Sequence, residues 1–361
     1  MANNFCRYLS NGFTFTTKGD SLKVQPCCFF LGPVVDIDGD VLHYRQTLNQ
    51  ITSWVPGCAH CQNMESIGQQ SLRQASFDWI GEENYQEPVS IDIHLDSACN
   101  AACVMCVENL SSLWKKENLK YSNKKIDIKL HDVNEIDGWI YKITNGFNLS
   151  KLRYIKFYGG EPMLTDTHIK FLEKIPCPQN VTLHYTTNGS IFPNDRTIKI
   201  WDKFKCVIFA ASIDGVDQQF DYLRWPLTWD KVSKNLLRIK QHKIHNVLFR
   251  LEFTVNFLNA WYYDQVENWM HNYFSHNEFG DVTEINLHLC GGGIFDTDFM
   301  PIALRNIVLE KYSADHKIHR LIKNLPVEKS ITNFFKFTDT WDPRRSNNWR
   351  EAFAEIQHFI P

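Results

Sequence analysis

Residues 89–106, VSIDIHLDSACNAACVMC, decide how the rest of the sequence is interpreted. The segment begins with an apolar run that predicts a β-strand, and the loop behind it carries Cys99, Cys103 and Cys106 in the spacing C-x3-C-x2-C. Three thiolates on one short loop can hold three irons of a 4Fe-4S cluster. Because no fourth cysteine lies nearby, one iron stays open and can bind a cofactor. The loop therefore predicts an iron–sulfur centre with an open coordination position.

Other uses of these three cysteines fit their spacing less well. Free cysteines do fill protein cores, but rarely at C-x3-C-x2-C. A structural zinc ion generally takes four protein ligands, and a catalytic zinc ion more often recruits histidine. Packing and zinc binding are therefore the alternatives to an iron–sulfur cluster at this loop.

The composition is that of a globular protein with many cysteines. Of its 361 residues 43% are hydrophobic and 22% charged, and the formal net charge is -3. These values exclude a disordered chain and argue against a protein that coats a polyanion by bulk charge. No signal peptide is visible, and no apolar run reaches the roughly 18 to 20 residues that span a bilayer. We expect a cytoplasmic protein without a membrane partner, in which clustered cysteines bind metal or do redox work.

From residue 89 onward, apolar runs alternate with longer amphipathic stretches. Helices are expected to begin at Asp132, at Thr165 or Asp166, and at Thr228, because these residues can cap a helix N-terminus. Strands joined by helix-length connections predict a parallel sheet covered by helices. The six expected strands are 89–95, 152–158, 181–187, 205–213, 246–255 and 283–290.

At the cysteine loop the sequence resembles the radical SAM superfamily, whose loop C-x3-C-x-aromatic-C follows the first strand of a partial barrel. Met105 stands where an aromatic residue is usual, and a soft methionine side chain can still pack near an adenine. The resemblance implies an α/β fold with a partial (β/α)6 TIM-like barrel. It also implies that the open iron binds S-adenosylmethionine, and that one electron cleaves it to a 5′-deoxyadenosyl radical that abstracts a substrate hydrogen.

Further motifs of the superfamily occur in the expected order at the ends of the expected strands. The second strand runs into Gly159-Gly160-Glu161-Pro162, similar to the GGEP motif, where two glycines let backbone carbonyls approach the methionyl ammonium group. A turn or a core residue explains any one of these motifs, so the weight lies in their joint order. The other cofactor contacts that the resemblance implies are Asn188 in a TNG turn, Ser212 and Arg224 at the ribose and carboxylate, and Val255 beside the adenine.

The first 85 residues contain a second group of cysteines. Cys58 and Cys61 form a chelating C-x2-C corner that two distant cysteines can complete. The whole pattern resembles the twitch module, a SPASM-related auxiliary-cluster module, placed here ahead of the barrel. It implies a second 4Fe-4S cluster on Cys6, Cys27, Cys58 and Cys61, with Cys28 a close substitute for Cys27. Zinc is the alternative at this site, since four thiolates suit either metal.

The domain boundaries that follow are 1–85 for the auxiliary module, 86–290 for the barrel, and 291–361 for an extension that packs on or caps the barrel. Cys177 and Cys206 are expected to pack, and Cys290 is expected to pack or to contact substrate, because it ends a strand. Glu65, Ser71 and Arg73 match the twitch pattern, but no role is assigned to them. The basic run 115–129 is expected to form a solvated surface. Surface ion pairs or a substrate lid are expected from Asp339, Asp342, Arg344 and Arg345.

The resemblance implies an oxidoreductase with two 4Fe-4S clusters and S-adenosylmethionine as cofactors. The second cluster would serve electron transfer during oxidation, bond formation or epimerisation of a peptide, sugar or nucleotide. A flavodoxin- or ferredoxin-type protein is the expected electron donor. The alternatives are a radical SAM enzyme that modifies nucleic acid, which is not favoured, and an iron–sulfur or zinc protein without catalytic activity.

Overall fold

A computed structural model describes residues 6–51, 53–66, 70–76, 80, 87–121, 132–242, 244, 246–274, 285–291, 293–325 and 330–361. The chain divides into two compact units, each built from several segments of sequence. The first unit comprises Met1–Ala98, Lys125–Thr186 and Pro193–Ile208, and the second comprises Cys99–Lys124, Thr187–Phe192 and Phe209–Pro361.

All six strands expected from the sequence are present in the described residues. They are hydrogen-bonded in chain order, and β4, β5 and β6 are parallel to one another, as are β8 and β9. The prediction of a parallel sheet is thereby confirmed for these strands. Their bounds are β4 (Ser90–His94), β5 (Tyr154–Phe157), β6 (Thr182–Thr187), β7 (Cys206–Ser212), β8 (Val247–Val255) and β9 (Ile285–Leu289).

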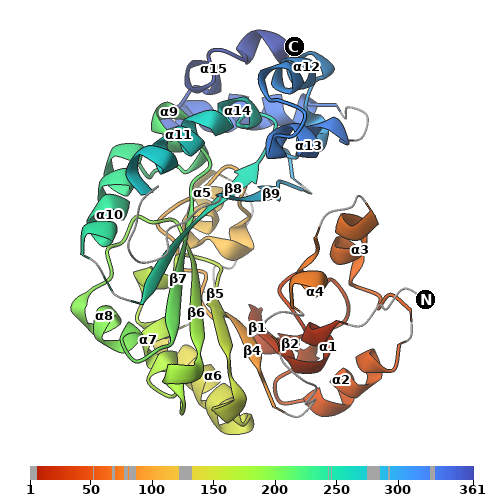
Figure 1. The fold of residues 1–361 in the computed structure, drawn as a ribbon, viewed down its shortest axis with the longest axis vertical. Coiled ribbons are helices and arrows are strands. Elements are labelled where there is room, and N and C mark those ends of the chain that lie inside the picture. Colours follow the sequence, from red (N-terminus) through yellow and green to blue (C-terminus); the bar gives the residue numbers. More distant parts are fainter. Residues whose placement is uncertain are drawn as a thin grey trace. The chain divides into compact units, whose positions relative to one another are not determined.

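The N-terminal segment adds three strands to the edge of this sheet. β1 (Gly12–Lys18) and β2 (Ser21–Gln25) form an antiparallel hairpin, and β2 also pairs with β3 (Val35–Asp36). β1 runs parallel to β4 (Figure 1). In the register of this pair, Thr14 lies opposite Asp92. The first turn-rich stretch of the sequence therefore shares a sheet with the strand that precedes the cysteine loop.

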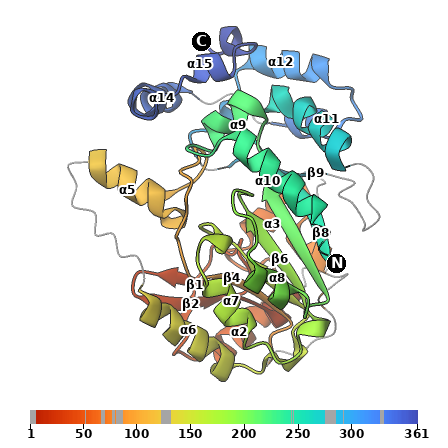
Figure 2. The same ribbon diagram turned by 90° about the vertical axis from the view of Figure 1, so that its left-hand side faces the viewer.

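Helices cover the strands of the first unit. α6 (Val133–Gly146) begins at Asp132 as predicted, and Asp132 and Glu135 form a reciprocal capping box. Its buried face carries Ile136, Trp139, Ile140 and Ile143, and α6 packs against α7 (Thr167–Leu172), which packs against α8 (Asp195–Trp201). Figure 2 shows α7 and α8 in front of the strands of this unit. The other helices here are α1 (Arg7–Asn11), α2 (Val41–Asn49), α3 (Ala59–Ser66) and α4 (Leu72–Ala75).

The second unit is mainly helical beyond β8 and β9. α10 (Trp229–Gln241) begins after Thr228 as expected, although the Thr228 side chain makes no capping hydrogen bond. No helix in the described segments is both long enough and apolar enough to cross a membrane. The remaining helices are α5 (Ser112–Tyr121), α9 (Asp217–Leu223), α11 (Tyr263–Phe274), α12 (Ile302–Lys311), α13 (Lys317–Lys323), α14 (Thr332–Arg345) and α15 (Trp349–Ala352).

Candidate metal centres and cofactor loop

The cysteine loop, residues 99–106, opens the second unit. Its start is tied to α5, because the Cys99 amide donates to Ser112 Oγ at 3.0 Å and the Ser111 hydroxyl donates to the Ala101 carbonyl at 2.6 Å. The Cys106 amide donates to the carbonyl of Cys103 at 2.9 Å, which closes a turn between two of the three thiols. The loop therefore presents its cysteines on a backbone that is held locally.

Segments far along the chain also bind this loop. The Ala102 amide donates to the Trp225 carbonyl at 2.7 Å, and the Val104 amide donates to the Leu223 carbonyl at 3.0 Å. The indole of Trp114 donates to the Cys103 carbonyl at 2.8 Å. Cys103 is thus flanked on both sides by peptide groups with fixed partners, which the local spacing of the cysteines does not predict.

Arg224 lies beside the central thiol of the loop. Its guanidinium pairs with the fully buried carboxylate of Asp214, and Nη1 lies 3.8 Å from Cys103 Sγ. Burial raises the pKa of Cys103, and the positive charge of Arg224 opposes that rise. Burial and the neighbouring Cys103 raise the pKa of Cys106 to about 12. These thiols are protonated at neutral pH, so metal binding must release their protons.

Met105 and Asn188 are each hydrogen-bonded to the side chain of an asparagine. The Asn256 side chain donates to the Met105 sulfur at 2.9 Å, and Asn256 directly follows Val255, the buried last residue of β8. The Asn188 amide donates to Asn100 Oδ1 at 2.8 Å, which connects the TNG turn to the cysteine loop. Asn100 lies between Cys99 and Cys103, and a polar side chain at this position is the one feature of the sequence that indicates such a hydrogen bond. Ser212 ends β7 and is half-buried.

The glycine motif belongs to the first unit. Gly159 and Gly160 have φ angles of +77° and +60°, and a Cβ at Gly160 would lie 2.4 Å from the Ala98 carbonyl oxygen. A Cβ at Gly159 would lie 2.3 Å from the His94 ring. The Glu161 amide donates to the Ala98 carbonyl at 2.7 Å, and Pro162 begins the following turn of 3₁₀-helix. These glycines are thus required by the end of β4 itself, irrespective of any ligand.

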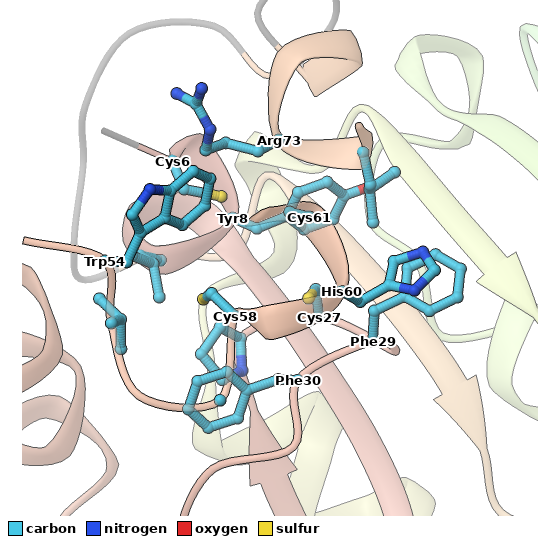
Figure 3. Close-up of a pocket in the computed structure, with 15 residues that line it drawn as sticks. Cys6, Tyr8, Cys27, Phe29, Phe30, Trp54, Cys58, His60, Cys61 and Arg73 are labelled. Carbon is cyan, nitrogen blue, oxygen red and sulfur yellow. The ribbon is translucent and has the colours of Figure 1, made fainter. Parts of the chain in front are cut away.

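Cys6, Cys27, Cys58 and Cys61 line one cavity in the first unit (Figure 3). Cys6 precedes α1, Cys27 follows β2, and the other two lie at the start of α3. Cys28 is absent from the lining. The rest of the wall is largely aromatic and apolar, with Tyr8, Phe29, Phe30, Trp54, Val55 and Leu72 among the residues.

The donor set of this cavity suits a metal cluster. Burial raises the pKa of Cys6 to about 11 and that of Cys58 to about 12, and neighbouring thiols add to both increases. Across the described ranges, no three Cys, His, Asp or Glu side chains converge closely enough to hold a single metal ion. A 4Fe-4S cluster is larger than one ion, so its thiolates surround it without meeting at one point.

Cys28 faces a different neighbour from Cys27. Burial and the nearby charge of Asp92 on β4 raise the pKa of Cys28 to about 12, and Asp92 accepts a hydrogen bond from the Thr14 hydroxyl at 3.2 Å. Burial raises the pKa of the Asp92 carboxyl. The two adjacent cysteines therefore belong to separate environments, one in the cavity and one against the sheet.

Glu65, Ser71 and Arg73 form a clip beside the cavity. The Glu65 carboxylate accepts from the Ser71 hydroxyl at 2.5 Å and from Arg73 Nε and Nη2 at 2.9 Å and 2.5 Å. Glu65 lies one helical turn after Cys61 on α3, while Arg73 lies on α4 and lines the cavity. The clip therefore joins the helix that carries Cys61 to the next helix, which gives these residues a structural role.

The structure corrects the expectation for Arg345 and describes only part of the basic run 115–129. Arg345 is not a surface residue, because its side chain is 2% exposed and pairs with Glu117 at 2.5 Å. Its neighbour Arg344 is exposed, as expected. Of the basic run, residues 115–121 lie in α5 and the rest fall outside the described residues.

Three further cysteines, Cys177, Cys206 and Cys290, belong to neither predicted ligand group. Cys290 follows β9 and is buried, and burial raises the pKa of its thiol to about 12. Cys206 begins β7 and Cys177 precedes a short 3₁₀ turn, and both are half-buried.

Comparisons with known proteins gave matches to solved structures only. No family model matches the chain, and no curated protein matches it. Native anSMEcpe with bound AdoMet aligns at 17% identity and a TM-score of 0.42, over 67% of this chain and 63% of that chain. Streptococcus suis SuiB bound to S-adenosylmethionine aligns at 10% identity and 0.37, over 80% and 58%. SuiB bound to its precursor peptide SuiA aligns at 10% and 0.37, over 95% and 75%.

Proposed function

We propose that this chain is a radical SAM enzyme with an auxiliary iron–sulfur cluster in its N-terminal part. The observation that carries the proposal is the cysteine loop. It combines C-x3-C-x2-C spacing, a position directly after β4, and a guanidinium held beside Cys103 by Asp214. A loop that only filled a core would have no need of a buried ion pair next to its central thiol.

Cys99, Cys103 and Cys106 would hold the first 4Fe-4S cluster. With its open iron occupied by S-adenosylmethionine, such a cluster supplies one electron that cleaves the cofactor to a 5′-deoxyadenosyl radical. The chain's own residues would bind and orient the cofactor. Met105, hydrogen-bonded by Asn256, would offer an apolar contact for the adenine, while the Arg224 guanidinium places a positive charge 3.8 Å from Cys103 Sγ.

The remaining cofactor contacts are proposed from the motifs. Gly159, Gly160, Glu161 and Pro162 would provide backbone groups for the methionyl end. Asn188, Ser212 and Val255 would contact the ribose and the adenine. Asn188 is hydrogen-bonded to Asn100 in the cysteine loop. Val255 directly precedes Asn256, whose side chain is hydrogen-bonded to Met105 in the same loop.

Cys6, Cys27, Cys58 and Cys61 would hold the second cluster. Support comes from the single cavity that these four thiols line, and from its aromatic wall, which limits the access of water. With four thiolates on the cluster, electron transfer is favoured over substrate ligation. Zinc is the competing metal for the same four thiolates.

The substrate class is proposed from the resemblance alone. A peptide, sugar or nucleotide would lose a hydrogen atom to the radical, in an oxidation, bond formation or epimerisation. A flavodoxin- or ferredoxin-type protein would supply the electron. The enzyme itself would have the fold of a partial (β/α)6 barrel and would act in the cytoplasm. The alternatives stay a nucleic-acid-modifying enzyme and a metal-binding protein without turnover.

The deciding experiment needs no substrate. Anaerobically purified protein is reconstituted with iron and sulfide, reduced with dithionite and given S-adenosylmethionine. We expect iron for two 4Fe-4S clusters per chain, and release of 5′-deoxyadenosine together with methionine. Zinc with half that iron would overturn the second cluster, and intact clusters that never yield 5′-deoxyadenosine would leave a binding protein. Stimulation of cleavage by RNA or DNA alone would favour the nucleic-acid alternative.

A further inference from the structure

Arg345 connects the C-terminal part of the chain to the cysteine loop. It is the last residue of α14, and its side chain is 2% exposed. Nη1 donates to the Ala102 carbonyl at 3.1 Å, and Nη2 donates to Glu117 Oε2 at 2.5 Å. One guanidinium therefore binds the loop directly and also binds α5, the helix that follows the loop.

Three tryptophan rings, those of Trp114, Trp225 and Trp341, lie within cation–π distance of the same guanidinium. Its central carbon lies 4.2 Å from the Trp114 ring centroid and 4.8 Å from the Trp225 ring centroid, within the range of cation–π interaction. Two of them, Trp114 and Trp225, also bind the loop, since the Trp114 indole donates to the Cys103 carbonyl and the Trp225 carbonyl accepts from the Ala102 amide. The groups that fix Arg345 are thus the groups that fix the backbone around Cys103.

We propose that Arg345 is a positioning residue for the cluster loop, which makes α14 part of the cofactor site. The inference rests on the proposed function, because it assigns Arg345 a role toward the cluster of that site. Without the guanidinium, the Ala102 carbonyl loses its donor and the buried Glu117 carboxylate loses its partner. The three thiols would then sit on a loop with several conformations in place of one.

Lysine cannot replace this arginine. A single ammonium can keep the charge opposite Glu117, but it has no planar fork that reaches two acceptors while lying between two rings. Arg345→Lys therefore preserves the buried ion pair and removes the bond to the loop. Arg344→Lys is the matched control, because Arg344 is the preceding residue on the same helix and is exposed.

The test compares wild-type protein, Arg345→Lys and Arg344→Lys after identical anaerobic reconstitution. Iron per chain is measured, and the EPR spectrum of the reduced protein is recorded against increasing S-adenosylmethionine. For Arg345→Lys we expect partial loss of iron, confined to the loop cluster, and an about 10- to 100-fold higher concentration for the spectral change, as for other partners of metal ligands. Arg344→Lys should match the wild type in both measurements.

A purely structural role would lower the melting temperature and leave the cofactor-dependent spectrum of the folded protein unchanged. Such a result, or a wild-type iron content and spectrum in Arg345→Lys, overturns the inference. If Arg345→Lys does not fold, Glu117→Gln tests the inference instead. This variant keeps the hydrogen bond from Arg345 to the Ala102 carbonyl and weakens only the ion pair that holds Arg345 in place. We then expect a smaller shift in the same direction, and an unchanged spectrum overturns the inference.

Failure of the proposed function gives a different pattern. In that case the wild-type protein itself shows no cluster at the loop, or no spectral response to S-adenosylmethionine. A wild type that shows both, with an Arg345→Lys variant that behaves identically, rejects only the role of Arg345.

Discussion

The two groups of cysteines are assembled in different ways. The loop group comes from eight consecutive residues, and its geometry is fixed by backbone hydrogen bonds to Trp225, Leu223 and Ser112. The cavity group comes from three separate segments, and its geometry depends on how a hairpin and two helices pack. The first arrangement depends on hydrogen bonds to one short loop, whereas the second depends on contacts between segments, such as the clip of Glu65, Ser71 and Arg73.

The largest expected effect is at the loop. Cys103→Ser should abolish 5′-deoxyadenosine formation and remove about half of the iron, because the central thiol is a proposed ligand of the loop cluster and lies beside Arg224. Iron analysis and product chromatography check this. Cys206→Ser, at the start of β7, is the control and should behave as wild type. Equal loss of iron in both variants would contradict the assignment.

The second prediction separates the two groups. The double variant Cys58→Ser/Cys61→Ser should lose the other half of the iron while still cleaving S-adenosylmethionine in the absence of substrate. The reason is that the two groups of thiols belong to different compact units. Complete loss of cleavage in this folded variant would show that the loop cluster depends on the N-terminal site.

A third prediction uses adjacent residues as each other's control. Cys27→Ala should lose the N-terminal iron, because Cys27 lines the cavity. Cys28→Ala should keep that iron and cost about 1 kcal/mol of unfolding free energy, since Cys28 is absent from the cavity lining and the change removes only one buried sulfur atom. Iron content and denaturant unfolding distinguish the two. The reverse outcome would assign Cys28 as the ligand.

The smallest effect concerns the clip. Glu65→Gln weakens the bonds to Ser71 and Arg73 without touching a thiol, so we expect iron to leave the N-terminal site about tenfold faster during chelation. Glu173→Gln, which disrupts an exposed ion pair with Arg196, is the matched control and should leave the rate unchanged. Equal rates in the two variants would reduce the clip to a surface feature.

Local patterns in the sequence predicted the parallel strands and the start of α6. The apolar runs match β4 to β9 within a few residues, and the capping residue Asp132 forms its capping box. These features depend on neighbours in the chain, so the sequence contains their signal.

Contacts between residues far apart in the chain could not be predicted from local sequence patterns. The burial of Arg345 depends on Glu117, which lies 228 residues earlier, and no local pattern distinguishes Arg345 from Arg344. The same holds for Cys27 and Cys28, whose separate environments follow from the pairing of β1 with β4. The pairing of the N-terminal hairpin with β4 was likewise missed, because its short strands are indistinguishable from turns in a cysteine-rich segment.

The pairing of β1 with β4 has a consequence for synthesis. Thr14 and Asp92 are 78 residues apart, so at ~5–20 residues per second the hairpin waits about 4 to 16 seconds for its partner strand. During that interval all the cysteines of the cavity group have been made, while one edge of β1 has no strand beside it. A nascent chain that stalls before residue 90 therefore presents reactive thiols next to an aggregation-prone edge, and chaperone protection in this window should raise the yield of folded protein.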